Sequence, residues 1–283
     1  MKCVSIDGFF EVGPGRPFLF IAGPCVLESE AVAREVASTL KELTDRLGVS
    51  YIFKSSYDKA NRTSLGSFRG PGIKDGLEIL GRIRADYSLP VISDVHDVTQ
   101  VEAAAAVLDV LQIPAFLCRQ TDLLLAAAGT QKIVSLKKGQ FVSPWDMKNA
   151  VDKIRSVAAD KLLLVERGAM FGYNNLVVDM RSFPVMRSLG CPVVYDATHS
   201  VQLPGGAGGS SGGQREFIPP LARAAVAAGI DGIFMEVHPD PNRALCDGPN
   251  SISLDQVEPL LKKLVALHGL VQDEVNASGE ENG

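Results

Sequence analysis

Eight short apolar runs recur along this chain at intervals of about 20 to 40 residues, and helical patterns separate them. Most of the runs are apolar at nearly every position, as expected of strands that are buried on both faces. The runs are residues 18–22, 51–54, 90–93, 110–113, 132–136, 162–165, 192–195 and 232–235. The helical patterns cover residues 30–47, 76–86, 98–107, 122–128, 144–158, 218–228 and 253–268. Strands that alternate with helices in this way predict a parallel sheet.

Eight strand–helix units favour a closed (β/α)8 barrel over an open, doubly wound sheet, although periodicity alone leaves both folds open. The 283 residues fit a barrel as one domain, because such barrels typically need about 250 residues. We therefore predict a single (β/α)8 barrel domain over residues 1–271, with a short N-terminal hairpin within residues 2–12. Residues 272–283 are polar, and we predict that they form a disordered C-terminal tail.

The composition argues against several classes of protein. The chain has a formal net charge of −5, so it is not basic overall, as a nucleic-acid-binding domain typically is. No apolar run reaches the roughly 18 residues of a membrane helix, and the N-terminus lacks a basic-then-apolar signal pattern. The five cysteines are odd in number and widely spaced, which argues against a disulfide framework. We expect a cytoplasmic protein without nucleic-acid or membrane partners, in which local clusters of Lys and Arg bind any anion.

Polar residues follow the predicted strands at the ends where barrel active sites form. Polar residues without a function would be scattered over both ends of the barrel. Their position at one end therefore predicts a functional site. The residues at these exits are Cys25, Lys54, Asp94, His96, Lys137, Arg167, His199 and Glu236, and Cys118-Arg119-Gln120 follows the remaining strand.

Several of the exit residues are cations. Lys54 and Lys59 flank Ser56 after the second strand, Lys137 follows the fifth and Arg167 follows the sixth. Any one of them could be a solvated surface charge. Together at one mouth they would bind a small polyanion, because phosphate and carboxylate groups favour charge-assisted hydrogen bonds. This pattern does not name the anion.

A possible metal site comes from residues that are far apart in sequence. Cys25, His199 and Glu236 follow strands one, seven and eight, which are neighbours in a closed barrel, and Asp247 follows later. A thiolate, an imidazole and two carboxylates could hold a divalent ion. Each residue also has an ordinary alternative, as a core thiol, a substrate contact or a turn cap, and the spacing is not a local metal motif.

A glycine-rich stretch at residues 204–213 follows the seventh strand. It lacks the G-x-G-x-x-G order of a dinucleotide site, so we interpret it as a lid loop. A loop without function remains the alternative.

Six long motifs resemble those of the 3-deoxy-D-manno-octulosonate 8-phosphate synthases, and the resemblance runs from about residue 18 to residue 268. The motifs are residues 53–64 (FKSSYDKANRTS), 112–122 (QIPAFLCRQTD), 137–141 (KKGQF), 167–173 (RGAMFGY), 196–202 (DATHSVQ) and 236–241 (EVHPDP). The resemblance implies a (β/α)8 barrel, usually a homotetramer. It also implies condensation of phosphoenolpyruvate with D-arabinose 5-phosphate, release of inorganic phosphate, and a role in lipopolysaccharide biosynthesis.

The resemblance also implies roles for individual residues. Phosphoenolpyruvate would be held by Lys54, Ser56, Lys59, Lys137 and Arg167. The aldose phosphate would be held by Asn61 and Arg62, helped by Phe116 and Arg119 of a neighbouring subunit. Asp94, His96 and Gln202 would contact the substrates or the reacting water. We expect the catalytic set to be Lys59, Asp94, His96, His199 and Asp247.

This family has a metal-free form with Asn at the first exit and a metal form with Cys there. Cys25 therefore implies a divalent ion, such as Zn, Fe or Mn, held by Cys25, His199, Glu236 and Asp247. The sequence from Cys246 to Pro249 resembles the metal-free form instead. The resemblance thus implies metal binding and leaves open whether the ion is essential.

Two other functions remain as alternatives. The related 3-deoxy-D-arabino-heptulosonate 7-phosphate synthases use erythrose 4-phosphate and tend to have Lys-Pro-Arg where this chain has Lys59-Ala60-Asn61-Arg62. The additional Asn suits a longer acceptor. A non-catalytic barrel that binds a sugar phosphate would need only part of the polar set.

Overall fold

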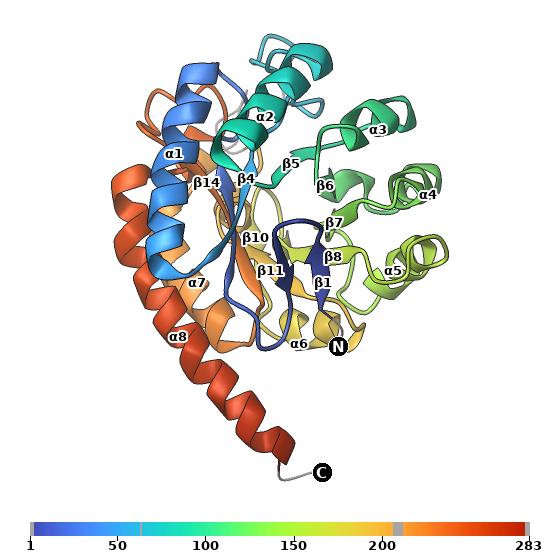
Figure 1. The fold of residues 1–283 in the computed structure, drawn as a ribbon, viewed down its shortest axis with the longest axis vertical. Coiled ribbons are helices and arrows are strands. Elements are labelled where there is room, and N and C mark those ends of the chain that lie inside the picture. The colour runs from blue at the N-terminus through green and yellow to red at the C-terminus, as the bar shows by residue number, and fades with distance from the viewer. Residues whose placement is uncertain (1–2, 63, 206–211, 281–283) are drawn as a thin grey trace.

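The computed structural model describes residues 3–62, 64–205 and 212–280, and it describes side chains as far as residue 272. Its centre is a barrel of eight parallel strands (Figure 1). Neighbouring strands pair in chain order, and β11 pairs with β14, which in turn pairs with β3, so the sheet is closed. The barrel prediction is confirmed, and the open sheet is wrong. The strands are β3 (Leu19–Gly23), β4 (Ser50–Lys54), β5 (Val91–Asp94), β6 (Val110–Ile113), β7 (Ile133–Lys137), β8 (Leu162–Glu166), β11 (Val193–Asp196) and β14 (Gly232–His238).

Helices surround the barrel and bury their apolar faces against the strands. In α1, residues at helical spacing such as Ala33, Val36 and Leu40 are buried. Ser29 caps this helix, and Gly48 ends it in the left-handed conformation with φ 65°. The helices are α1 (Glu30–Leu47), α2 (Ile73–Tyr87), α3 (Val98–Ala105), α4 (Thr121–Gly129), α5 (Met147–Arg155), α6 (Ser182–Ser188), α7 (Ile218–Ala227) and α8 (Leu254–Glu280).

Two of these helices differ from the sequence-based expectation. The prediction missed α6, because its seven residues include a proline and are too few to show a clear helical period. The last helix, α8, begins one residue after the predicted start and runs to Glu280, past the predicted boundary at residue 271. Residues 281–283 lie outside the described residues, and a disordered tail stays a prediction.

The N-terminal hairpin closes one end of the barrel. Its strands β1 (Val4–Ile6) and β2 (Phe10–Val12) pair antiparallel, and Figure 1 shows them in dark blue in front of the barrel. Val4, Ile6 and Val12 are buried in one cluster with inward-facing strand residues such as Phe234. The expected hairpin is therefore confirmed, and it covers the apolar interior at the end opposite the strand exits.

We expect Ile6→Ala to lower the free energy of unfolding by about 2 to 5 kcal/mol, the usual cost of truncating a buried isoleucine. Ile6 is 1% exposed, whereas its neighbour Ser5 is exposed on the same strand. The matched variant Ser5→Ala should change stability by no more than about 0.5 kcal/mol. Urea unfolding of both variants measures the difference, and equal effects would contradict this role of the hairpin.

Short antiparallel pairs extend the loops at the strand exits. In the loop after β8, β9 (Ala169–Met170) pairs with β10 (Leu176–Val177). In the loop after β11, β12 (Gln202–Leu203) pairs with β13 (Gly212–Gly213). After β14, by contrast, β15 (Ile252–Ser253) pairs with β14 in parallel. The middle of the predicted lid, residues 206–211, lies outside the described residues, so the lid stays a prediction.

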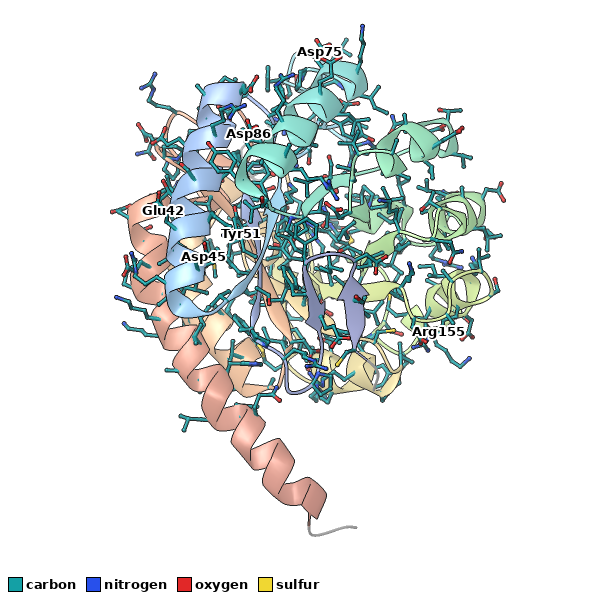
Figure 2. The ribbon with its side chains drawn as sticks, in the orientation of Figure 1. Glu42, Asp45, Tyr51, Asp75, Asp86 and Arg155 are labelled. Carbon is teal, nitrogen blue, oxygen red and sulfur yellow. The ribbon has the colours of Figure 1, made fainter. Side chains whose placement is uncertain are left out.

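Acidic side chains lie on the outer faces of α1 and α2. Figure 2 shows Glu42 and Asp45 on α1 and Asp75 and Asp86 on α2, and all four side chains are exposed. Among the described helices, none is both long enough and apolar enough to cross a bilayer.

Candidate active site

A cavity of about 490 Å³ opens at the end of the barrel where the parallel strands exit. Most of the predicted site residues line it, which confirms that residues distant in sequence meet at one rim. The lining includes Lys54, Lys59, Asn61, Arg62, Asp94, His96, Phe116, Lys137, Arg167, His199, Gln202 and Asp247. Of the others, Cys25, Ser56 and Glu236 are buried and contact lining residues. Arg119 is exposed and is not among the residues that line the cavity.

The strand register explains why charged groups are buried here. Lys54, Asp94 and Lys137 are the last residues of β4, β5 and β7, so the barrel brings them to one end. Their exposed fractions are only 0%, 8% and 6%. The ammonium groups of Lys54 and Lys137 lie 5.3 and 4.0 Å from the ring centre of Phe234, which belongs to the inner core. The charged rim thus rests directly on the apolar interior.

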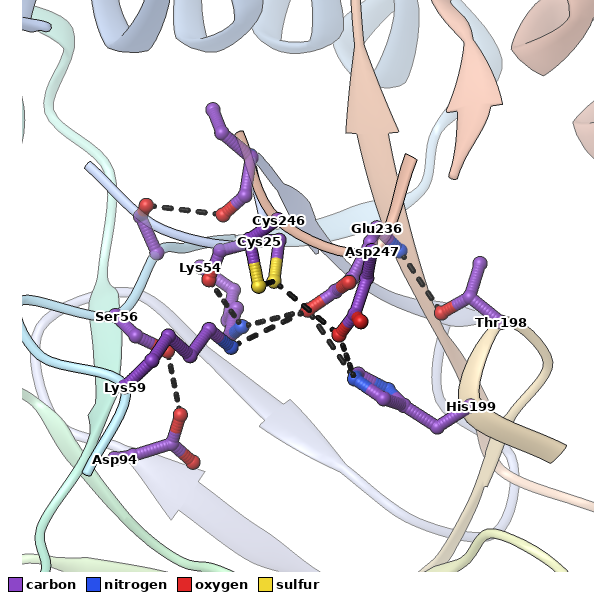
Figure 3. A network of polar contacts seen from close by, with 12 residues as sticks. Cys25, Lys54, Ser56, Lys59, Asp94, Thr198, His199, Glu236, Cys246 and Asp247 are labelled. Carbon is purple, nitrogen blue, oxygen red and sulfur yellow. Dashed lines mark hydrogen bonds and ion pairs between the residues drawn. The ribbon is translucent and has the colours of Figure 1, made fainter. Parts of the chain in front are cut away.

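The buried lysines are paired with buried carboxylates. Lys54 Nζ donates to Glu236 Oε1 at 3.1 Å, and Lys59 Nζ lies 3.7 Å from the same oxygen (Figure 3). Lys137 Nζ donates to Asp196 Oδ2 at 2.7 Å. Burial lowers the pKa of Lys137, and the Asp196 carboxylate partly offsets this effect. Buried charges that are paired in this way are costly to leave without a partner.

Asp94 is held as a carboxylate by its surroundings. Burial alone would raise its pKa, but the nearby charges of Lys54, Lys59 and Lys137 hold it well below its ordinary value. Ser56 Oγ donates to Asp94 Oδ2 at 2.5 Å, and Gln112 Nε2 donates to Oδ1 at 2.6 Å. The Ser56 hydroxyl proton is therefore directed to Asp94 in this structure.

Two other polar groups of the site have hydrogen-bonding capacity to spare. Arg167 Nη2 donates to Gln202 Oε1 at 2.8 Å, whereas Nη1 is buried and has no partner within the described part of the chain. His96 Nδ1 is likewise buried and has no partner among the described residues. The backbone N–H of His96, in contrast, donates to Gln100 Oε1 at 3.0 Å. A buried guanidinium nitrogen without a partner is costly, so Arg167 is suited to receive an anionic ligand.

His199 lies between three carboxylates. Its Nδ1 is 2.7 Å from Asp196 Oδ2, and its Nε2 is 3.3 Å from Glu236 Oε1 and 3.7 Å from Asp247 Oδ2. Burial would lower the pKa of His199, but Asp196 and Glu236 outweigh burial and raise it to about 9. Asp196 accepts at Nδ1 and so directs Nε2 toward Glu236 and Asp247, which is the arrangement of many metal-binding histidines.

The predicted metal residues fall into two overlapping groups of donor atoms. One group is Cys25, Cys246 and Asp247, the other is His199, Glu236 and Asp247, and within each group the atoms lie within 4.8 Å of one another. Cys25 Sγ is 3.5 Å from Asp247 Oδ2. Glu236 Oε2 is buried without a hydrogen-bond partner among the described residues. These observations fit a divalent ion. A carboxylate oxygen without a hydrogen-bond partner, a thiol and an imidazole together make a suitable set of ligands.

The thiol of Cys25 has to lose its proton before it can bind a metal ion. Burial raises the pKa of its thiol well above the ordinary value, and contact with Cys246 raises it further. A bound divalent ion would favour the thiolate instead, because coordination deprotonates a thiol.

Sequence reasoning missed several residues of this site. Asp196 orients His199 and pairs with Lys137, and it is the last residue of β11, so the strand-exit rule itself could have found it. Gln112 and Gln140 lacked such a signal, because Gln112 lies inside β6 and Gln140 lies three residues beyond the end of β7. Cys246 was seen only as part of a motif, although it lines the cavity next to Cys25.

Known proteins resemble this chain over most of its length. The DAHP synthetase I family matches residues 4–273. A relative from Desulfotalea psychrophila is 69% identical over 262 residues, which cover 93% of this chain and 94% of the relative. One from Syntrophotalea carbinolica is 63% identical over 260 residues, covering 92% and 94%. One from Geotalea daltonii is 60% identical over 272 residues, covering 96% and 100%.

All three relatives carry the name 2-dehydro-3-deoxyphosphooctonate aldolase. Because the family match spans nearly the whole described barrel and these relatives cover more than nine tenths of the chain, the chain belongs to the DAHP synthetase I family.

Proposed function

We propose that this protein joins phosphoenolpyruvate, D-arabinose 5-phosphate and water to give 3-deoxy-D-manno-octulosonate 8-phosphate and inorganic phosphate. The relatives' name describes the same type of product, since a 2-dehydro-3-deoxyoctonate is a 3-deoxyoctulosonate, and an aldolase acts on a carbon–carbon bond. The observation that carries the proposal is the cavity in which Lys54, Lys59, Lys137 and Arg167 converge beside the metal-type donors. The protein is then a transferase of octulosonate biosynthesis, the precursor route of lipopolysaccharide.

The buried cations form the site for phosphoenolpyruvate. Its carboxylate and phosphate together need several charge-assisted donors, and Arg167 Nη1 and the three lysines offer them. Burial would lower the pKa of Lys59, but the neighbouring acidic groups, Cys25 and Glu236 first among them, raise it well above the ordinary value, so Lys59 stays cationic. Ser56 belongs to this site through Asp94.

The acceptor is held at the outer part of the cavity. Asn61 and Arg62 lie in the loop after β4 and line the cavity, where they hold the aldose phosphate. Phe116 and Arg119, in the loop after β6, complete this part from a neighbouring subunit. In the single chain, Phe116 lines the cavity of its own barrel and is 57% exposed.

The reaction forms a carbon–carbon bond and a carbon–oxygen bond from water, and it breaks the carbon–oxygen bond to phosphate. C3 of phosphoenolpyruvate attacks the aldehyde carbon of the acceptor, and positive character develops at C2. Water adds at C2, and phosphate then leaves with the electrons of the broken C–O bond, so that C2 becomes a ketone. Of the two protons of the water, one ends on the former aldehyde oxygen and the other on the departing phosphate. Asp94, His96 and Gln202 line the space where the water and the sugar hydroxyls are held. Most of the rate gain comes from positioning and from charges fixed before the reaction.

A divalent ion is part of this proposal, held by Cys25, His199, Glu236 and Asp247. When bound, it supplies a Lewis acid that polarises the aldehyde oxygen or orients the water. The thiol and imidazole donors favour Zn or Fe, whereas Mn is better suited to an all-oxygen site.

Self-association is also supported, by exposed apolar side chains beside the cavity. Large side chains in the loops after β6, β7 and β8 are exposed, with fractions from 52% to 99%: Phe116, Phe141, Trp145, Met170, Phe171 and Tyr173. Exposed apolar residues that cluster in this way commonly mark protein interfaces. The homotetramer with shared sites, which the resemblance implies, would cover them.

A phosphate-release assay with both acceptors tests the proposed reaction. We expect one phosphate per phosphoenolpyruvate consumed with D-arabinose 5-phosphate, and a much lower kcat/KM with erythrose 4-phosphate. Preference for erythrose 4-phosphate would assign the seven-carbon reaction instead. Binding of both ligands in calorimetry without phosphate release would indicate a non-catalytic barrel.

A further inference from the structure

Two cysteine side chains that are 221 positions apart meet below the cavity. The Sγ atoms of Cys25 and Cys246 are 2.9 Å apart, and Figure 3 shows both sulfurs facing the carboxylates of Glu236 and Asp247. Both residues are buried, with exposed fractions of 4% and 2%. Cys246 also lines the cavity, whereas Cys25 is not among the residues that line it.

We propose that Cys246 is a further ligand of the divalent ion, so that the site binds its metal through two thiolates. This inference rests on the proposed metal site and adds a donor to it. Asp247 belongs to both groups of donor atoms, so an ion beside its carboxylate is within reach of Cys246 as well as of His199 and Glu236.

The distances between donor atoms support a shared ion. Ligands of one tetrahedral zinc lie about 3 to 4 Å apart, given bonds of about 2.0 to 2.3 Å. The distances from Asp247 Oδ2 to Cys25 Sγ and to His199 Nε2 are 3.5 and 3.7 Å. The two sulfurs, at 2.9 Å, need to separate by less than about 1 Å to hold an ion between them.

The backbone conformation at Asp247 is unusual, and it allows two consecutive residues to bind the same ion. Asp247 has φ 50° and ψ 28°, the left-handed conformation that Asp tolerates better than most residues. In extended backbone, successive side chains point to opposite sides. Here Cys246 and Asp247 belong to the same group of donor atoms, so both face the same space.

The sulfur of Cys246 also contacts a residue of the proposed acceptor site. Arg62 Nη1 lies 2.7 Å from Cys246 Sγ, and a guanidinium has only donors to offer. Arg62 is the proposed partner of the acceptor phosphate, so the same contact joins the acceptor site to the metal site.

X-ray absorption by the zinc-loaded wild-type protein counts the sulfur ligands without any substitution. We expect two zinc–sulfur distances near about 2.3 Å, with nitrogen and oxygen ligands at about 2.0 to 2.2 Å. A single sulfur ligand would overturn the inference and leave the proposed four-residue metal site in place. Failure of the metal-free protein to bind zinc would remove both proposals.

Cobalt binding to full-length variants assigns the second sulfur. The intensity of the thiolate-to-cobalt charge-transfer band per bound ion should fall by about half in Cys246→Ser and in Cys25→Ser, because the band scales with the number of thiolates. Cys191→Ser is the control, since Cys191 is equally buried but contacts Arg155. An unchanged band in Cys246→Ser would contradict the inference.

Discussion

Lys137→Met is expected to lower kcat/KM for phosphoenolpyruvate by about 100- to 1,000-fold, the usual effect of removing a charged donor from a closed active site. Lys137 is 6% exposed, and its ammonium group both faces the cavity and donates to Asp196. Methionine preserves the length of the side chain and removes the charge. Breaking this buried pair also costs about 3 to 5 kcal/mol of stability, out of a typical total of about 5 to 15 kcal/mol for a domain.

The neighbouring Lys138 provides a matched control. It is 2% exposed, but its ammonium group donates to the backbone oxygens of Gly139, Val142 and Gly168 and lies 3.4 Å from Glu166. Lys138→Met should therefore lower the free energy of unfolding and leave KM for phosphoenolpyruvate close to that of the wild type. Steady-state kinetics and urea unfolding of both variants separate the two roles. Equal losses of kcat/KM would show that Lys137 acts only on stability.

Asp196→Asn is expected to weaken zinc binding by about 10- to 100-fold and to lower kcat by a similar factor, because partners that orient a metal-binding histidine have effects of this size. Asp196 Oδ2 lies 2.7 Å from His199 Nδ1 and accepts from Lys137. An asparagine can turn its NH2 group toward Nδ1, which then has to accept, and the proton moves to Nε2. Nε2 is the atom that faces Glu236 and Asp247, so the lone pair needed for metal binding is lost.

The same substitution should change the protonation of His199 in the metal-free protein. Burial lowers the pKa of His199 and Asp196 raises it, to about 9 in the wild type. Without the Asp196 carboxylate the pKa should fall, so the imidazole becomes neutral at a lower pH. Nuclear magnetic resonance titration measures this shift, and competition with a coloured chelator measures zinc affinity.

Asp231→Asn is the control for Asp196→Asn. Asp231 is also buried, with 2% exposure, but it pairs with Arg187 and accepts from the backbone of Val193 at the start of β11. This variant should lose stability and keep its zinc affinity. If Asp196→Asn binds zinc as tightly as the wild type, the orienting role of Asp196 is wrong.

The fold was largely predictable because the strands are buried on both faces. The apolar run at 110–113 coincides with β6, and the other strands differ from the prediction by one to three residues at an end. The count of eight strand–helix units favoured a closed barrel, but no local pattern encodes the closing contact, which is the pairing of the last barrel strand, β14, with the first, β3. Short α6 was missed because a seven-residue helix owes its stability to packing more than to its own sequence.

The location of the site was predictable from one rule, that polar residues at strand exits meet at one end of a barrel. The rule found Lys54, Lys137 and His199, which do line the cavity. It could not give their partners, because the pairing of Lys54 with Glu236 depends on side-chain geometry. The contact between Cys25 and Cys246 was beyond prediction for the same reason, since it joins two loops at opposite ends of the chain.

Diffraction from crystals of the full chain soaked with phosphoenolpyruvate tests the central claim most directly. We predict that the ligand occupies the cavity at the strand exits, with its carboxylate or phosphate oxygens within hydrogen-bond distance of Lys137 Nζ and Arg167 Nη1. The part of the cavity around Arg62 should stay open for the acceptor. Ligand bound elsewhere on the protein, with Lys137 and Arg167 in contact only with solvent and protein, would contradict the account.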